Sequence, residues 1–188
     1  HLRNDGSGSY DYAYDANGNV TMNSHGDTFA WDYSNRLTSY TASSPASYSY
    51  DYVGRRRSMT IYGTTTRYIS EGAQTAGERN TSTGVSTDYL FGPGIDEPLA
   101  KHTANGAISY YCVDGLGSIV LTTDSAGITT GSNRYTAWGS PAIIPGDLFG
   151  YTGRESGGLS WFYRARYYDA PTGRVLSEDP QPLQSGDI

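Results

Sequence analysis

The chain has 188 residues and a formal net charge of −6, with 18 tyrosines, 24 glycines and one cysteine. Strand-favouring aromatic residues and turn-forming glycines dominate, while good helix formers are scarce, which excludes a helical bundle, a coiled coil or a doubly wound α/β enzyme. The mildly acidic charge predicts no nucleic-acid partner, because nucleic-acid binders are usually basic. No segment approaches the roughly 20 apolar residues that a membrane span needs.

Short aromatic and β-branched segments alternate with turn residues along the whole chain, which predicts an all-β fold of antiparallel hairpins. The strands expected in the first part are 9–14, 19–23, 28–32, 36–41, 47–52, 56–62 and 64–70. Residues 71–86 show no apolar period, which predicts an exposed loop. Strands are expected again at 87–91, 99–103, 108–113, 119–123 and 128–135, followed by a loop over 136–147 and one aromatic segment over 159–168.

An aromatic residue followed by aspartate recurs three times near the N-terminus, as Tyr14-Asp15, Trp31-Asp32 and Tyr50-Asp51. Each pair precedes a Gly or Asn and then an Asn or Arg, in Gly18-Asn19, Asn35-Arg36 and Gly54-Arg55. The aspartates are 17 and 19 residues apart, a period that indicates a repetitive architecture. We interpret each unit as a hairpin turn, in which the carboxylate accepts backbone hydrogen bonds and Gly supplies a positive φ.

Four segments of the second half complete the pattern: Tyr110–Ser118, Tyr135–Gly139, Gly150–Glu155 and Tyr163–Pro180. With the repeats, they resemble the YD-repeat or Rhs (rearrangement hotspot) family and its repeat-associated core module. The core-motif residues that match are Asp114, Leu116, Gly117, Arg164, Arg166, Tyr167, Tyr168, Asp169, Gly173, Arg174, Asp179 and Pro180. The chain departs from the family after Asp179-Pro180, because Gln181-Pro182 follows where the family has any residue and then Gly.

The resemblance implies a large secreted or surface protein, extracellular and bacterial, in which hairpins form a strongly twisted, coiling antiparallel sheet. That sheet is part of a hollow β-shell or tube, and in bacterial members the shell encloses a toxin. Residues 1–70 would then be repeat hairpins and 87–188 a core-like segment of one continuous β-structure. The expected partners are adjacent repeats of a longer chain, other copies of this chain, or an enclosed toxin cargo.

The expected function is that of a non-enzymatic structural module, with no cofactor and no metal. One alternative is a head-to-tail subunit of an extracellular filament. A second alternative is an autoproteolytic core, because the family's self-cleavage resembles aspartic-protease chemistry, which needs two carboxylates that share a proton. The residues that match those carboxylates are Asp169 and Asp179.

For the other chemically distinctive residues, the sequence predicts structural or solvent-exposed roles. Cys112 is expected to be a buried structural thiol, and the cluster Arg55-Arg56-Arg57 to be a solvated strand start. Three histidines lack metal-ligand spacing: His1, His25 and His102. Asn19 and Asn80 begin glycosylation sequons whose use the sequence leaves open.

Overall fold

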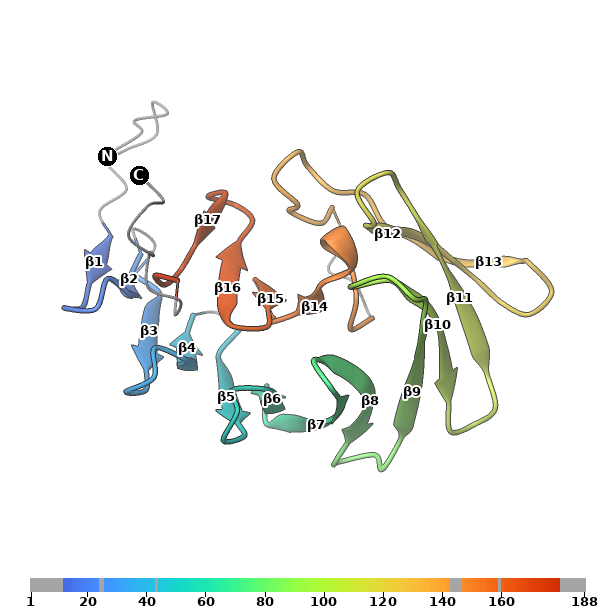
Figure 1. Ribbon diagram of the computed structural model, residues 1–188, viewed down its shortest axis with the longest axis horizontal. Coiled ribbons are helices and arrows are strands. Elements are labelled where there is room, and N and C mark those ends of the chain that lie inside the picture. The colour runs from blue at the N-terminus through green and yellow to red at the C-terminus, as the bar shows by residue number, and fades with distance from the viewer. Residues whose placement is uncertain (1–11, 24–25, 43, 143–146, 159, 180–188) are drawn as a thin grey trace.

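The computed structural model describes residues 12–23, 26–42, 44–142, 147–158 and 160–179. It confirms the all-β fold, because thirteen strands form one antiparallel sheet and four short strands form a second sheet (Figure 1). The strands of the large sheet are Ala13–Tyr14 (β1), Val20–Met22 (β2), Thr28–Trp31 (β3), Leu37–Thr41 (β4), Ala46–Tyr50 (β5), Arg56–Ile61 (β6), Thr64–Glu71 (β7), Gln74–Asn80 (β8), Ser86–Phe91 (β9), Pro98–Thr103 (β10), Ile108–Val113 (β11), Ile119–Thr123 (β12) and Thr129–Ser132 (β13). The small sheet contains Glu155–Ser156 (β14), Trp161–Tyr163 (β15), Arg166–Asp169 (β16) and Arg174–Val175 (β17).

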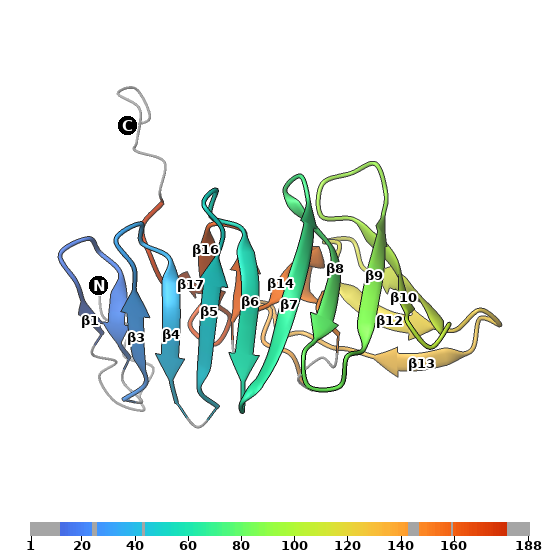
Figure 2. The ribbon, with the colours of Figure 1, turned by 90° about the horizontal axis from the view of Figure 1, so that it is seen from below.

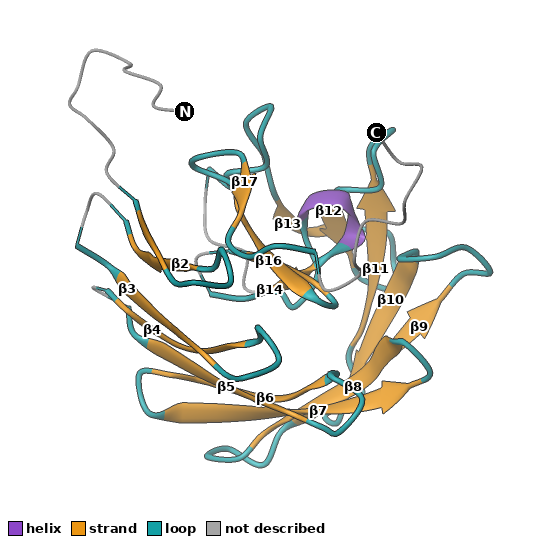
Figure 3. Cartoon of the chain, turned by 60° about the vertical axis from the view of Figure 1, so that its left-hand side comes forward, coloured by secondary structure: helices purple, strands orange, loops and turns teal. Residues whose placement is uncertain are grey.

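Each strand of the large sheet pairs with the strands that precede and follow it in sequence, so the topology is a continuous meander (Figure 2). The meander curves strongly, and the small sheet lies on its concave side (Figure 3). The helix Tyr151–Gly153 (η1) is a single 3₁₀ turn between the two sheets in sequence. Within the described part of the chain, no helix is long and apolar enough to cross a membrane.

The first hydrophobic cluster lies between the two sheets, at the N-terminal half of the large one. Tyr40 and Tyr48 of the large sheet are buried with Phe162 and Tyr167 of the small sheet. The rings of Tyr48 and Tyr167 lie 5.0 Å apart, and the Tyr48 hydroxyl donates a hydrogen bond to the Gly157 carbonyl. Tyr48 can fill this interior because its hydroxyl finds an acceptor while its ring covers apolar surface.

The second cluster lies at the C-terminal half of the large sheet. Tyr68, Tyr89 and Tyr111 are buried there with Phe149, which precedes η1. The Tyr89 and Phe149 rings meet edge to face at 4.8 Å, the arrangement that aromatic quadrupoles favour. Both clusters are therefore built by buried tyrosines of the large sheet, one from each contributing strand, and closed by aromatic residues of the last 40 residues of the chain.

The expected loop over 71–86 is wrong, because β8 occupies residues 74–80 and continues the sheet between β7 and β9. The residues of β8 that face inward include Thr75 and Gly77, which are buried although neither is apolar. An added Cβ on Gly77 would lie 3.1 Å from the Thr87 carbonyl, so only a small residue fits against the next strand. A search for apolar periodicity misses strands whose buried face is made of small residues.

Three further expectations are also wrong. First, the β-structure is not one continuous sheet but two. The aromatic segment 159–168 contributes to the smaller sheet through the β15–β16 hairpin, which turns at Arg164 with a φ of 59°. Cys112 is exposed, because it lies on the outward face of β11 opposite the buried Tyr111. Arg56 is 2% exposed and lies between the two sheets, so the arginine cluster is not a solvated strand start.

The packing of the small sheet against the large one should contribute to the stability of the fold. Phe162 is 5% exposed, and its replacement by alanine leaves a cavity between the sheets. We expect Phe162→Ala to lower the free energy of unfolding by about 3–5 kcal/mol in urea titrations. The control is Tyr33→Ala, at a ring that is 93% exposed, which should change it by about 0.5 kcal/mol or less. Equal losses in both variants would show that the small sheet does not close the core.

Candidate functional site

A row of aspartate-centred turns lies along one edge of the large sheet. In the turn after β3, the Asp32 Oδ1 atom accepts hydrogen bonds from the backbone N–H groups of Ser34 and Arg36, at 2.9 and 3.0 Å. Asp51 makes the same bonds after β5. The same carboxylate geometry recurs on this side of the sheet at Asp15 and Asp114. It recurs on the opposite side at Asp124, in the turn between β12 and β13. Each of these turns contains a residue with positive φ, namely Gly18, Asn35, Gly54, Gly117 and Gly127.

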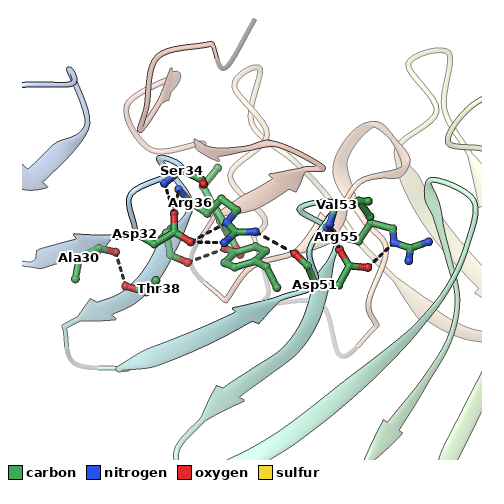
Figure 4. A network of polar contacts seen from close by, with 11 residues as sticks. Ala30, Asp32, Ser34, Arg36, Thr38, Asp51, Val53 and Arg55 are labelled. Carbon is green, nitrogen blue, oxygen red and sulfur yellow. Dashed lines mark hydrogen bonds and ion pairs between the residues drawn. The ribbon is translucent and has the colours of Figure 1, made fainter.

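Arginine side chains connect successive turns of this row. The Arg36 Nε atom donates to Asp32 Oδ2 at 2.7 Å, and its Nη1 atom donates to the Asp51 carbonyl of the next turn at 3.0 Å (Figure 4). Arg55 repeats the arrangement with Asp51 and with the Gly72 carbonyl. Asp32 and Asp51 therefore each shape their own turn and also orient the arginine that contacts the following turn.

The turn aspartates give stability that depends on pH. Hydrogen bonds from Asn19 lower the pKa of Asp15. Burial acts to raise the pKa of Asp32 and Asp51, but hydrogen bonds from Arg36 and Arg55 outweigh it, so both values lie below the ordinary one. A carboxyl whose pKa is lowered by folding stabilises the protein above the pKa of its unfolded state and loses that contribution as the pH falls through its folded value.

We therefore expect the urea midpoint of unfolding to fall as the pH drops below about 4, the ordinary range of an aspartate pKa. The triple variant Asp15→Asn, Asp32→Asn, Asp51→Asn should be less stable at pH 7 and should show a flatter profile between pH 7 and pH 3. An unchanged slope in the variant would mean that other carboxyls cause the acid sensitivity.

A buried arginine joins the two sheets behind this row of turns. The Arg56 Nη2 atom lies 2.8 Å from Glu155 Oε2 and donates to the Ser156 carbonyl at 2.9 Å. Its guanidinium lies 4.6 Å from the ring centroid of Tyr68 and 4.7 Å from that of Phe162. The second carboxylate oxygen of Glu155 accepts a hydrogen bond from Thr75 Oγ1 at 2.6 Å. β6, β7 and β8 are thus connected to β14 and β15 through one cation.

Breaking this pair should be costly because it leaves a charge without its partner in a buried site. We expect Arg56→Met to lower the free energy of unfolding by about 3–5 kcal/mol, and the double variant Arg56→Met, Glu155→Gln to recover much of that loss. Urea titration measures both, with Arg57→Met at the neighbouring exposed position as the control. A double variant as unstable as Arg56→Met alone would show that the loss comes from packing and not from charge.

A cleft of about 450 Å³ opens between the row of turns and the β15–β16 turn. Four arginines line it, together with Glu155, an exposed tyrosine and three small residues: Arg36, Arg55, Arg56, Arg164, Tyr52, Ser34, Gly54 and Ser70. Arg164 forms an ion pair with Asp96, which also binds Arg154. This cleft, which we call the arginine cleft, is the candidate functional site, because cationic donors from three separate turns converge on it.

The predicted aspartate pair has a different setting. Asp169 ends β16 and accepts a hydrogen bond from Thr172 Oγ1 at 2.6 Å. Asp179 forms an ion pair with Arg166 at 3.2 Å, and its side chain is 52% exposed. Neither carboxylate lines the arginine cleft.

Asp169 also lines a smaller cavity, of about 190 Å³, between the sheets. Tyr40 lines the same cavity, and its buried hydroxyl has no hydrogen-bond partner among the described residues. Burial, with the nearby charges of Asp27 and Asp169, raises the pKa of Tyr40 to about 12. The Tyr40 hydroxyl therefore keeps its proton at neutral pH.

The other core-motif residues form turns or pack against neighbouring side chains. Asp114, Leu116 and Gly117 form the turn between β11 and β12. Tyr167 is 1% exposed, and the Tyr168 hydroxyl donates to the Trp138 carbonyl at 2.9 Å. Arg174 pairs with Asp169 across β16 and β17, and Gly173, with φ of 67°, lies against the Trp138 ring. Pro180, His1 and His25 lie outside the described residues.

One half-buried group could hold and release a proton. The Tyr89 hydroxyl donates to Glu78 Oε1 at 2.8 Å, and burial raises the pKa of Glu78. Lys101 of β10 lies nearby and forms an ion pair with Asp147.

Among the residues described, no group of three or more His, Cys, Asp or Glu side chains could hold a metal ion. His102 is exposed, and Asn19 is fully buried and bonded to Asp15 and Asn35.

The chain resembles known bacterial proteins over most of its length. It is 31% identical to the tRNA3(Ser)-specific nuclease WapA of Bacillus spizizenii and 32% identical to the tRNA nuclease WapA of Bacillus subtilis, in each case over 93% of this chain. It is 27% identical, over 74% of its length, to the double-stranded DNA deaminase toxin A of Burkholderia cenocepacia. The chain spans 8% of the nucleases and 12% of the deaminase. No family model matches.

The fold is also found in a solved structure. The crystal structure of TcdB2-TccC3-Cdc42 superposes with a TM-score of 0.71 over 89% of this chain and 10% of that one, at 20% sequence identity. Identity this low shows a shared fold alone.

These relatives correct the expected function. The expectation of a non-enzymatic structural module, with its filament and autoproteolytic alternatives, is wrong, because the relatives that match 93% of the chain are named as nucleases and one that matches 74% is named as a deaminase toxin. This chain makes up a small part of the length of those relatives. The exclusion of nucleic acid rested on net charge, which is a chain average and does not report a local group of arginines such as the cleft.

Proposed function

We propose that this chain is a segment of a larger bacterial toxin that acts enzymatically on nucleic acid, with RNA cleavage as the activity. The observation that carries the proposal is the similarity to two tRNA nucleases over 93% of the chain. The deaminase toxin, which matches less of the chain at lower identity, supports a nucleic-acid substrate of the same broad class. Because the chain spans 8% of the nucleases, the proposal concerns the polypeptide to which the segment belongs.

We assign the segment to the YD-repeat (Rhs) part of such a toxin. Support comes from the aspartate turns that repeat along one edge of the sheet, and from the fold shared with TcdB2-TccC3. Strands β1 and β13 end the sheet order, and adjacent repeats of the same polypeptide are the partners proposed for them. The proposed location is extracellular, with the catalytic portion of the toxin as enclosed cargo.

The test uses the natural full-length polypeptide that contains this sequence. Purified protein is incubated with total tRNA, and separately with single- and double-stranded DNA, and the products are resolved on denaturing gels and by sequencing. We expect discrete tRNA fragments that appear with time and that heat-treated protein does not produce. Intact tRNA together with unaltered DNA sequence would contradict the proposal, whereas base changes in DNA without RNA cleavage would replace nuclease activity with deamination.

A further inference from the structure

The arginine cleft presents cations to solvent and keeps their counter-charges below them. The Arg55 side chain is 38% exposed, whereas its partner Asp51 is 8% exposed. Arg164 is also 38% exposed, and its partner Asp96 is 17% exposed. Each pair is neutral as a whole, but a ligand that enters the cleft meets guanidinium groups first.

The guanidinium groups of the cleft do not use all of their hydrogen-bond donors within the protein. A guanidinium carries five N–H donors. Arg55 bonds through Nε and Nη1, and Arg164 bonds through Nη2, so each has further N–H groups without an acceptor among the described residues. The cleft therefore offers planar donor groups of the kind that bind phosphate oxygens in pairs.

An aromatic side chain completes the cleft. Tyr52 is 94% exposed and projects from the turn that also carries Arg55. Exposed aromatic rings next to cationic donors are the combination that binds single-stranded nucleic acid, because bases stack on the ring while phosphates pair with the cations. A volume of about 450 Å³ is in the range of small-ligand sites, roughly 300–1,000 Å³, and does not admit a duplex.

We propose that the arginine cleft binds the phosphate backbone of single-stranded nucleic acid, with Arg55 and Arg164 contacting phosphates and Tyr52 stacking on a base. The inference rests on the proposed function, since it takes nucleic acid as the substrate of the whole protein. It assigns this segment the role of holding the strand. An acidic peptide would satisfy the arginines but would leave the exposed Tyr52 ring without a stacking partner.

Fluorescence anisotropy with a labelled 12-nucleotide oligouridine, at several salt concentrations, tests the assignment in the full-length polypeptide. We expect Arg164→Gln to weaken binding about tenfold and to reduce the slope of log K against log salt by about 0.7, the value for one phosphate contact on a single strand. Tyr52→Ala should weaken binding several-fold and leave that slope unchanged, because it removes stacking and no charge.

The matched controls are Arg67→Gln and Arg79→Gln, which remove the same charge from exposed positions of β7 and β8 outside the cleft. Both should bind as the unaltered protein does. Because Tyr52 is almost fully exposed, Tyr52→Ala retains the fold and keeps the test decisive if an arginine variant is unstable. Equal binding by the cleft variants and the controls, or displacement of the oligonucleotide by polyglutamate at equal concentration, would overturn the assignment.

Activity on tRNA, measured with the same variants, separates this inference from the proposed function. If the unaltered polypeptide cleaves tRNA and the cleft variants bind and cleave equally well, the cleft assignment fails and the proposed function stands. If the unaltered polypeptide leaves nucleic acid intact but binds oligouridine through the cleft, the proposed function fails and the assignment stands.

Discussion

The buried cation Arg56 is the interaction on which the arrangement of the two sheets depends. Its guanidinium forms an ion pair with Glu155 and lies against the rings of Tyr68 and Phe162, so one side chain connects the large sheet to the small one. A charge in such a place is tolerated only when a counter-charge lies beside it, as Glu155 does here. The requirement fixes where β14 and β15 lie, and with them the floor of the arginine cleft.

The row of turns gives the second constraint. Each aspartate closes its own hairpin, and arginines such as Arg36 and Arg55 bond to the carbonyl of the next turn. Hairpins connected in this way cannot slip relative to each other without losing charge-assisted hydrogen bonds. The edge of the sheet is therefore regular, and Tyr52 and Arg55 are presented at defined positions along it.

Much of this edge could be predicted from the sequence because it depends on residues close together in the chain. The spacing of Asp32, Asn35 and Arg36 indicates a turn with a positive φ and a carboxylate acceptor, and hydrogen bonds of that kind are observed. The cleft could not be predicted in this way. Arg56 and Arg164 are more than a hundred residues apart, and nothing local in the sequence shows that they share one cleft.

The sequence by itself determined the all-β fold class and the chemistry of the turns, because strand propensity and hydrogen bonding within five residues act locally. Only the tertiary structure decided that the β-structure divides into two sheets, that β8 is a strand and that Arg56 is buried while Cys112 is exposed. Those outcomes depend on which surfaces remain to be covered once the large sheet has curved. Within β6, Arg56 is buried and Arg57 is exposed, because successive side chains of a strand point to opposite faces.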